Sequence, residues 1–385
     1  MRLSHEDLPM FFEPAHAELG ARLIKAAAAV AAAEDAADED ARDRGAVEAL
    51  AKADLFDLVA PASGKPDSRS LCLAREMLGY VSARADSIFA VQGLGVHALL
   101  LAGSPQQREE ARSYARGAGI AAFALTEPEA GSDVAAIQTR AAPVAEGYRL
   151  DGDKLFISNL GIADHATVVA STEPALGASG LTAFWIPLDA PGVTVKPLTA
   201  MAPHPIGALE LRGVVVPASA RIGEVGQGMK LAMQTLDAFR VSVGAAAVGM
   251  ARRALDEATK FVTHRIQFGK PLSEQPLIQA HLADMVVDLD AARLLVLRAA
   301  HKKDTTSERV TTEVSIAKLG ATEAASRVID RAVQLFGGRG VMAGAVVEHL
   351  YRAIRPLRIY EGTSEIQRTI IGRAQAAAFA PAKKR

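Results

Sequence analysis

The sequence predicts an α+β protein of several domains, in the order helices, strands, helices. Two observations support this plan. Residues 1–118 and 221–385 carry apolar side chains at helical spacing. Residues 119–220 instead form short segments rich in Val, Thr, Ile and aromatic residues, separated by Gly, Pro, Asn and Asp turns. We therefore expect an N-terminal α-helical domain (1–118), a central antiparallel β-domain built as a small barrel or sandwich (119–220), and a C-terminal bundle of long helices (221–385).

The composition restricts the class of partner and the compartment. The chain has 385 residues, and its 43 Lys and Arg nearly cancel 44 Asp and Glu, which argues against nucleic acid or an anionic membrane surface as the main partner. The single Cys72 allows no intrachain disulfide and no thiolate metal site, and the nine histidines are scattered, so we expect no metal. We expect a cytoplasmic protein without a signal peptide, and no apolar run of about 18 residues that could span a membrane.

The N-terminal region predicts several helices. Residues 17–45 are rich in Ala and end in a charge cluster, and residues 86–103 continue the helical pattern. Ser104 and Pro105 have the residue types preferred at a helix N-cap and first position, so a further helix should begin there. The abundant Ala suggests helices that pack through small side chains.

The central region contains one loop suited to a ligand. The string FALTEPEAGSD (123–133) leaves a predicted strand and enters a loop that contains Gly. Thr126 offers a hydroxyl, Gly131 permits close approach of the backbone, and Ser132 can donate to an anionic oxygen. An ordinary hairpin loop is the alternative interpretation.

The C-terminal region predicts one long helix and two further motifs. Residues 227–265 contain no proline, which is typical of a bundle helix. The preceding GEVGQGMK (223–230) lacks the spacing of a phosphate loop and is interpreted as a connection. The string RIQFGKPL (265–272) then ends the helix, and Arg265 could bind a phosphate through two parallel hydrogen bonds. The string QLFGGRG (334–340) is a helix ended by Gly, which is a common arrangement.

The string YEGTSEIQR (360–368) admits two interpretations. Thr363 or Ser364 could be the N-cap of a last helix, with Glu361 and Glu365 favoured near its N-terminus. Glu361 could instead be a catalytic base. These nine residues alone favour the helix-start interpretation.

Four strings taken together suggest a family. The strings TEPEAGSD, RIQFGKPL, QLFGGRG and IYEGTSEIQR, in this order, resemble the acyl-CoA dehydrogenase family of flavoproteins, and the resemblance covers nearly the full chain. It implies an N-terminal helical domain, a central β-domain, which we take to be an antiparallel β-barrel, and a C-terminal four-helix bundle. It also implies non-covalent FAD, an acyl-CoA substrate, a role in fatty acid metabolism, an electron-transfer flavoprotein as acceptor, and a homotetramer built as a dimer of dimers.

The resemblance assigns flavin contacts to five segments. Contacts with the flavin are implied for Phe123, Leu125 and Thr126, and for the strand residues Phe156, Ile157 and Ser158. Ser132 is implied near the pyrophosphate and the CoA arm. Contacts with the FAD of a neighbouring subunit are implied for Arg265 and Phe268, and contacts with the adenosine end for Gln334, Leu335, Phe336, Gly337 and Gly338. The last flavin contacts are implied for Thr363 and Glu365. For Phe156, packing in the β-core is the alternative.

The resemblance makes Glu361 the base and places the acyl-CoA near LDAFR (236–240). Asp237 and Arg240 are implied as acyl-CoA contacts, although an i,i+3 ion pair on a solvated helix face is the alternative. A minority of the family carries its base at the position of Phe239, which cannot accept a proton. Glu361 therefore remains the base, Phe239 is predicted to line the acyl pocket, and Gly362 is small because the thioester stacks close to this turn.

The implied reaction removes the α-proton of an acyl thioester while the β-hydrogen leaves as hydride to flavin N5. An α-C–H is weakly acidic, so donors must stabilise the enolate-like oxygen, and the family uses the backbone N–H of the base and a ribityl hydroxyl. The carboxylate also needs a pKa raised by an apolar acyl chain that excludes water. Related alternatives on the same fold are a flavin oxidase, an acyl-carrier-protein dehydrogenase, and a non-catalytic FAD-binding relative that binds nucleic acid.

Three positions and one motif depart from the family pattern. The motif is the family's Gly-Tyr-x-x-Glu string, whose acid is missing because VMAGA (341–345) follows QLFGGRG. The family usually has Gln at Pro276, where it helps to hold FAD, so Gln275 is the candidate substitute. Ala353 replaces the usual acid after Arg352, and Pro356 replaces a helix or turn residue. These departures concern FAD affinity, subunit packing and substrate class, and acyl chain length is not fixed by the sequence.

Overall fold

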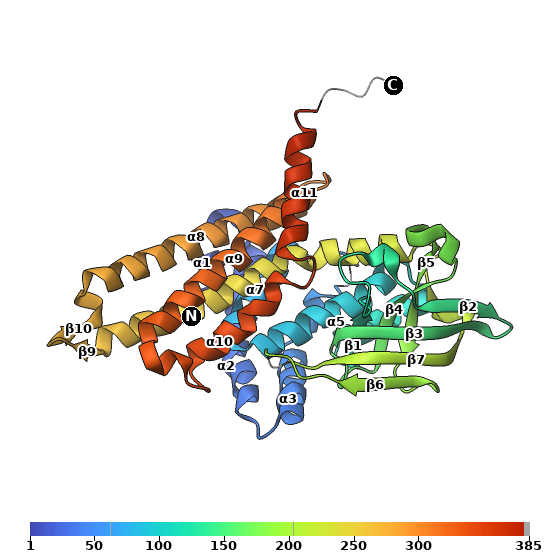
Figure 1. Cartoon of the computed structure of the whole chain (residues 1–385), viewed down its shortest axis with the longest axis horizontal. Coiled ribbons are helices and arrows are strands. Elements are labelled where there is room, and N and C mark those ends of the chain that lie inside the picture. Colours follow the sequence, from blue (N-terminus) through green and yellow to red (C-terminus); the bar gives the residue numbers. More distant parts are fainter. Residues whose placement is uncertain (62, 203, 381–385) are drawn as a thin grey trace. The chain divides into compact units, whose positions relative to one another are not determined.

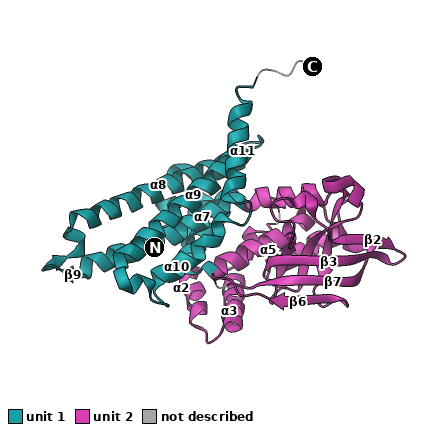
Figure 2. Ribbon diagram, in the orientation of Figure 1, with its two compact units in different colours: residues 1–25, 68–83, 240–385 teal, residues 26–67, 84–239 magenta. Residues whose placement is uncertain are grey.

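The computed structural model describes residues 1–61, 63–202 and 204–380 (Figure 1). Packing groups the chain into two compact units (Figure 2). Unit 1 consists of Met1–Lys25, Ser68–Ala83 and Arg240–Arg385, and unit 2 consists of Ala26–Asp67 and Arg84–Phe239. Each unit is therefore discontinuous in sequence, and the division into three consecutive domains stays a prediction.

The first third of the chain is helical, as expected. Its α-helices are α1 Ser4–Asp7, α2 Pro14–Ala32, α3 Glu39–Lys52, α4 Ser68–Val81, α5 Ala83–Ala102 and α6 Pro105–Ala115. The predicted start of α6 is confirmed: Ser104 Oγ accepts from the Gln107 N–H at 3.2 Å, and the Gln107 side chain accepts from the Ser104 N–H at 2.9 Å. This reciprocal pair is a capping box, and Pro105 occupies the first helical position.

Helix α5 corrects one expectation. By length and composition alone, Ala83–Ala102 could cross a membrane, so the prediction that no segment qualifies is wrong. However, 83% of its most apolar window is buried inside the protein. Val96 and Leu99, for example, share a core with Ala121 and Trp185 of the sheet. A mostly buried apolar helix is typical of a protein core, so α5 is weak evidence for a membrane segment.

Unit 2 contains an eight-stranded mixed sheet. Its strands are β1 Ala121–Ala124, β2 Arg140–Val144, β3 Gly147–Ser158, β4 His165–Ser171, β5 Leu181–Pro187, β6 Val193–Pro197, β7 Ile206–Pro217 and β8 Arg221–Ile222. The order is β6-β7-β3-β2-β4-β5-β8, with β1 also paired to β4. The side chains of its core come from alternate positions, including Leu150, Val168, Phe184, Leu209 and Leu211.

The sheet differs from the predicted antiparallel barrel in two ways. Strand β1 runs parallel to β4 over Ala121–Ala124, and β2 meets β4 in parallel at Arg140 and Ser171. No pairing joins the outer strands β6 and β8 within the described residues, so no closed barrel forms there. The reason is topological: the β2–β3 hairpin lies between β1 and β4 in sequence, so β4 returns beside β1 in the same direction. The residue pattern within an individual β-strand does not predict which other strand it pairs with.

Unit 1 is dominated by long helices. They are α7 Gly228–His264, whose first residues to Phe239 belong to unit 2, α8 Pro276–Thr305, α9 Thr311–Phe336, α10 Val346–Ile354 and α11 Ser364–Ala377. A short hairpin, β9 Ile266–Gln267 and β10 Lys270–Pro271, joins α7 to α8. Helix α9 packs against α8, α10 and α11, and α4 packs against α8. The long proline-free helix is confirmed.

Small residues allow α4 and α7 to approach closely. A Cβ on Gly249 would lie 2.1 Å from the Glu76 carbonyl oxygen, and one on Gly79 would lie 2.3 Å from the Ala246 carbonyl oxygen. No larger side chain fits at either position without moving the helices apart. The sequence led us to expect packing through small side chains because Ala is abundant, and at this crossing the small residues in closest contact are glycines.

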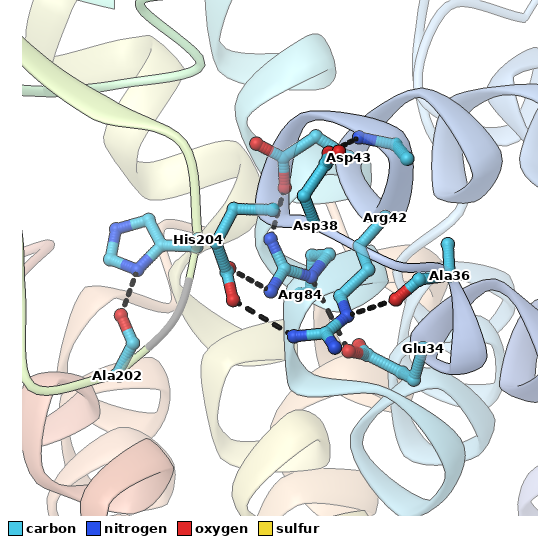
Figure 3. Close-up of polar contacts among 10 residues, drawn as sticks. Glu34, Ala36, Asp38, Arg42, Asp43, Arg84, Ala202 and His204 are labelled. Carbon is cyan, nitrogen blue, oxygen red and sulfur yellow. Dashed lines mark hydrogen bonds and ion pairs between the residues drawn. The ribbon is translucent and has the colours of Figure 1, made fainter.

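A buried arginine of α5, Arg84, forms ion pairs with residues of α3 within unit 2 (Figure 3). Arg84 is 2% exposed and binds the carboxylates of Asp43 and Glu39, and its Nε lies 3.4 Å from Glu34. Burial raises the pKa of the Asp43 carboxyl despite the neighbouring guanidinium. Asp38 caps the start of α3 by accepting from the Ala41 N–H at 2.8 Å. The cluster thus pairs a buried guanidinium with the nearly buried Asp43 and with carboxylates that reach the surface.

We expect Arg84→Met to lower the free energy of unfolding by about 3–5 kcal/mol, because it leaves the buried Asp43 carboxylate without its cation. Urea denaturation measures the loss. The control is Arg44→Met, which removes an exposed ion pair to Asp40 on the same helix and should have little effect. Equal denaturation midpoints for the two variants would contradict a structural role for the Arg84 cluster.

Candidate active site

The predicted base lies on a left-handed turn in unit 1, directly before α11. Glu361 has φ +52° and Gly362 has φ +91°. A positive φ is unfavourable for a residue with a side chain, so Glu361 must be held by its surroundings. A Cβ on Gly362 would lie 2.5 Å from Gln367 Nε2, so only glycine fits there without displacement. The strained residue is therefore the one to which the sequence assigns proton transfer.

Three side chains bind the carbonyls of this turn. Arg240 Nε of α7 donates to the Glu361 carbonyl oxygen at 2.9 Å. Lys318 Nζ of α9 donates to the Gly362 carbonyl oxygen at 2.8 Å, and Gln367 Nε2 of α11 donates to the same oxygen at 3.0 Å. The turn thus joins three helices of unit 1 through its backbone.

The helix-start interpretation is confirmed for the residues after Glu361. Thr363 is the N-cap of α11, and its Oγ1 accepts from the Ile366 N–H at 3.3 Å. Ser364 instead donates to Glu323 Oε1 at 2.6 Å. Glu365 is exposed in the first turn, and hydrogen bonds with its own backbone N–H and with Thr363 lower the pKa of its carboxyl. Glu361 lies outside the helix, so helix-start chemistry does not account for it.

The residues of LDAFR (236–240) have distinct environments. Arg240 is 6% exposed and binds the Glu361 carbonyl, so it does not lie on a solvated helix face. Asp237 is partly buried. Phe239 is fully buried, with its ring edge-on to His97 at a centroid distance of 5.4 Å. The roles of Asp237 and Phe239 toward an acyl group stay predictions.

A second group of predicted residues meets at a pocket of unit 1. The pocket has a volume of about 410 Å³ and is lined by Phe261, Arg265, Gln267, Leu272, Leu335, Phe336, Gly337, Gly338 and Arg339. Phe261 stacks on Phe336 at a centroid distance of 4.4 Å, and the Arg339 guanidinium lies 5.9 Å from the centroid of Phe261. The structure therefore brings Arg265 together with Leu335–Gly338, which the sequence places about 70 residues apart.

Three predicted flavin residues do not line this pocket. Phe268 lies at the tip of the β9–β10 hairpin with φ +52° and is 94% exposed. Gln275 is the N-cap residue of α8, and Gln334 lies in the last turn of α9 with an exposed side chain. Their roles as cofactor contacts stay predictions.

The predicted flavin residues of unit 2 gather where two segments meet. The Leu155 N–H of β3 donates to the Thr126 carbonyl oxygen at 3.0 Å, which joins the TEPEAGSD loop to the strand that carries Phe156, Ile157 and Ser158. Phe123 is partly buried, Leu125 is buried and Ser132 is exposed. The loop and the strand, predicted separately, are therefore adjacent.

Phe156 lies at a bulge of β3 and points outward. The pairing register of β3 with β7 shifts between Lys154 and Ile157, and Phe156 has φ +59°. Its side chain is 63% exposed, so the alternative of β-core packing is wrong. Ile157 is buried, and Ser158 Oγ lies 3.4 Å from His204 Nε2. A bulge that re-aims a side chain is frequent beside functional sites.

The sequence analysis did not predict the buried ion pair between Lys154 of β3 and Glu127 of the TEPEAGSD loop. Lys154 Nζ donates to Glu127 Oε1 at 2.8 Å and to the Leu125 carbonyl oxygen at 3.1 Å. Glu127 also accepts from the Thr139 N–H at 3.0 Å. Burial lowers the pKa of Lys154 to about 8, whereas for Glu127 the opposing partners outweigh burial and hold its carboxyl pKa below the usual value. A lysine at the inward position of a strand, in line with Leu150, was the available signal.

Sequence reasoning also missed Lys318. Its side chain is fully buried, and burial lowers its pKa to about 8 against the attraction of the Glu361 carboxylate. Lys318 occupies the inward face of α9, with Val314, Ala317 and Ala321 as buried neighbours at helical spacing. A charged residue on that face was again the only sign in the sequence.

Comparisons with known proteins agree with the four motifs. The family model "Acyl-CoA dehydrogenase, middle domain" matches residues 122–214, and "Acyl-CoA dehydrogenase, C-terminal domain" matches residues 226–376. The probable acyl-CoA dehydrogenase FadE25 of Mycobacterium tuberculosis is 38% identical over 312 residues, which are 80% of this chain and 80% of that protein. The caffeyl-CoA reductase–Etf complex subunit CarC of Acetobacterium woodii is 35% identical, covering 84% of this chain and 88% of that protein.

A solved structure extends the similarity to the fold. Butyryl-CoA dehydrogenase from Megasphaera elsdenii superposes with a TM-score of 0.87 at 32% sequence identity. The match covers 95% of this chain and 99% of that chain. The described fold is thus shared over almost the whole length.

We expect Gly362→Ala to lower the free energy of unfolding by more than about 1 kcal/mol, because a methyl group meets Gln367 and the residue has φ +91°. The control is Gly372→Ala in the exposed part of α11, where a Cβ meets nothing within 4 Å. That change should stabilise by up to about 1 kcal/mol through helix propensity. Chemical denaturation measures both, and the same sign for the two variants would contradict the assigned turn.

Proposed function

The chain belongs to the acyl-CoA dehydrogenase family, and we propose that it oxidises the Cα–Cβ bond of an acyl-CoA thioester with Glu361 as the base. The observation that supports this proposal is the geometry of the Glu361–Gly362 turn. A carboxylate residue with positive φ stands where three side chains fix the backbone, which is the arrangement expected of a positioned general base. Strain that the surroundings maintain is common at catalytic residues.

The proposed cofactor is FAD, and the residues present fit it. Arg265 supplies a guanidinium suited to a phosphate, and the stacked Phe261 and Phe336 supply an aromatic wall beside it. In unit 2, Phe156 offers an exposed ring, and the backbone hydrogen bond from Leu155 to Thr126 joins its strand to the TEPEAGSD loop. When bound, the flavin supplies the hydride acceptor, and the protein supplies position and electrostatics.

The protein contributes three actions to the proposed reaction. The Glu361 carboxylate takes the α-proton, and the Glu361 N–H is the proposed donor to the thioester oxygen as enolate-like charge develops. Arg240 and Lys318 fix the peptide groups that follow Glu361, which limits the directions its side chain can take. Exclusion of water by an apolar acyl chain would strengthen each of these interactions.

The names of relatives support a substrate class and an electron acceptor. Butyryl-CoA and caffeyl-CoA appear in the names of two similar proteins, and CarC belongs to a complex with an electron-transfer flavoprotein. We propose a CoA thioester and an electron-transfer flavoprotein for this chain. Chain length and branching of the acyl group stay open to measurement.

We also propose a homotetramer. Unit 1 exposes apolar side chains along the β9–β10 hairpin and α8, namely Ile266, Phe268, Leu277, Val286 and Val287. Exposed apolar groups of this kind favour a protein interface. The pocket that contains Arg265 opens beside this hairpin, so a neighbouring copy could share its cofactor there.

We expect the purified protein to be yellow and its flavin to be bleached by at least one acyl-CoA under anaerobic conditions. The measurement mixes the enzyme with straight, branched and aryl-substituted acyl-CoAs and follows the long-wavelength flavin absorbance. If only carrier-protein thioesters bleach the flavin, the substrate is an acyl-carrier-protein thioester and not an acyl-CoA. Rapid peroxide formation in air would indicate an oxidase. The proposal fails if no thioester reduces the flavin.

We expect Glu361→Gln to keep FAD but to slow flavin reduction by a factor of about 10² or more, because the amide cannot accept the α-proton. Stopped-flow reduction with the best acyl-CoA measures the rate. The control is Glu308→Gln, an exposed carboxylate in the segment between α8 and α9, which should reduce at the normal rate. A near-normal rate of flavin reduction in Glu361→Gln would show that another residue is the base.

A further inference from the structure

We propose that Lys318 is a positioning residue, which holds the Glu361–Gly362 turn and whose positive charge keeps the Glu361 carboxylate ready to accept a proton. This inference rests on the proposed function for its catalytic part. Its structural part rests on contacts within unit 1 alone.

The position of Lys318 is difficult to explain by stability. A fully buried ammonium loses its hydration, which costs several kcal/mol, and a single charged hydrogen bond to a backbone carbonyl recovers only part of this loss. A leucine of similar volume would pack against Val314 and Ala321 without that cost. A buried charge in contact with a strained turn therefore indicates a functional constraint.

Lys318 and Arg240 act on consecutive peptide groups. Arg240 binds the carbonyl of Glu361, and Lys318 binds the carbonyl of Gly362. Both peptide planes that follow the Cα of Glu361 are therefore fixed from two different helices, α7 and α9. Since a positive φ at Glu361 is unfavourable, losing either bond should let the turn relax and redirect the carboxylate.

The charges around Lys318 define its electrostatic role. Glu361 of the turn and Glu365 of α11 attract its ammonium, as does Glu323 of its own helix, whereas Arg240 of α7 repels it. Lys318 and Arg240 are both cations that bind backbone carbonyls of the Glu361–Gly362 turn. Removing the charge of Lys318 leaves that of Arg240 in place, so proton release from Glu361 should become harder but should not be abolished.

The test uses the FAD-bound enzyme and the variant Lys318→Met, which keeps the length and removes the charge. Hydrogen exchange measured by mass spectrometry should show about tenfold faster exchange in peptides that cover residues 359–367, because one charged hydrogen bond is lost. The acidic limb of the pH profile for flavin reduction by an acyl-CoA should move up by about one pH unit.

The control is Lys302→Met, which removes a partly exposed lysine of α8 that pairs with Glu313. It should change neither measurement. Lys318→Gln serves as a second variant if Lys318→Met does not fold, and it should show the same shift of the acidic limb because it also lacks the charge.

Two results would overturn the inference. Exchange at 359–367 equal to that of the unmodified enzyme would show that Lys318 does not hold the turn. An unchanged acidic limb would show that its charge does not act on the base. If no thioester reduces the flavin of the unmodified enzyme, the proposed function fails, and the exchange measurement still decides whether Lys318 holds the turn.

Discussion

The structure of unit 1 around the proposed base depends on one constraint: two backbone carbonyls in succession are bound by buried or nearly buried cations. Arg240 takes the carbonyl of Glu361 and Lys318 takes that of Gly362. A buried charge must find a partner where it lies, so the position of each helix that carries a cation becomes coupled to the turn. The unfavourable φ of Glu361 is maintained by this coupling and not by local preference.

The same arrangement occurs in unit 2. Lys154 donates to the carbonyl of Leu125 beneath the TEPEAGSD loop, as Lys318 donates to the carbonyl of Gly362. Burial lowers the pKa of both lysines to about 8. In each unit a buried lysine therefore anchors the backbone of a segment to which the sequence assigns a function. A neutral side chain would avoid the cost of desolvation but could not supply a charged hydrogen bond.

Local sequence signals predicted the features that depend on local physics. The helix start at Ser104 and Pro105, an N-cap at Thr363 or Ser364 and the uninterrupted α7 follow from side-chain chemistry within a few residues. The mixed sheet could not be predicted in this way, because the parallel pairing of β1 with β4 joins segments about 40 residues apart. The outward direction of Phe156 depends on a bulge, and the roles of Lys154 and Lys318 depend on partners distant in sequence. A lysine on an inward face is usually read as a side chain that reaches solvent, so pattern alone gave neither residue a role.

The departures from the family pattern lie at positions where the local structure accepts them. Pro276 is the first residue of α8, where a missing N–H costs nothing, and Pro356 lies at the start of a short 3₁₀ segment, Arg355–Arg358. Ala353 is buried in the core with Leu350 and Leu357, a place where an acid would need a partner. None of the three is among the residues that bind the carbonyls of Glu361 and Gly362 in the described part of the chain. Their consequences should therefore concern how unit 1 holds a cofactor or a second copy, whereas the geometry for proton removal depends on the turn and its cations.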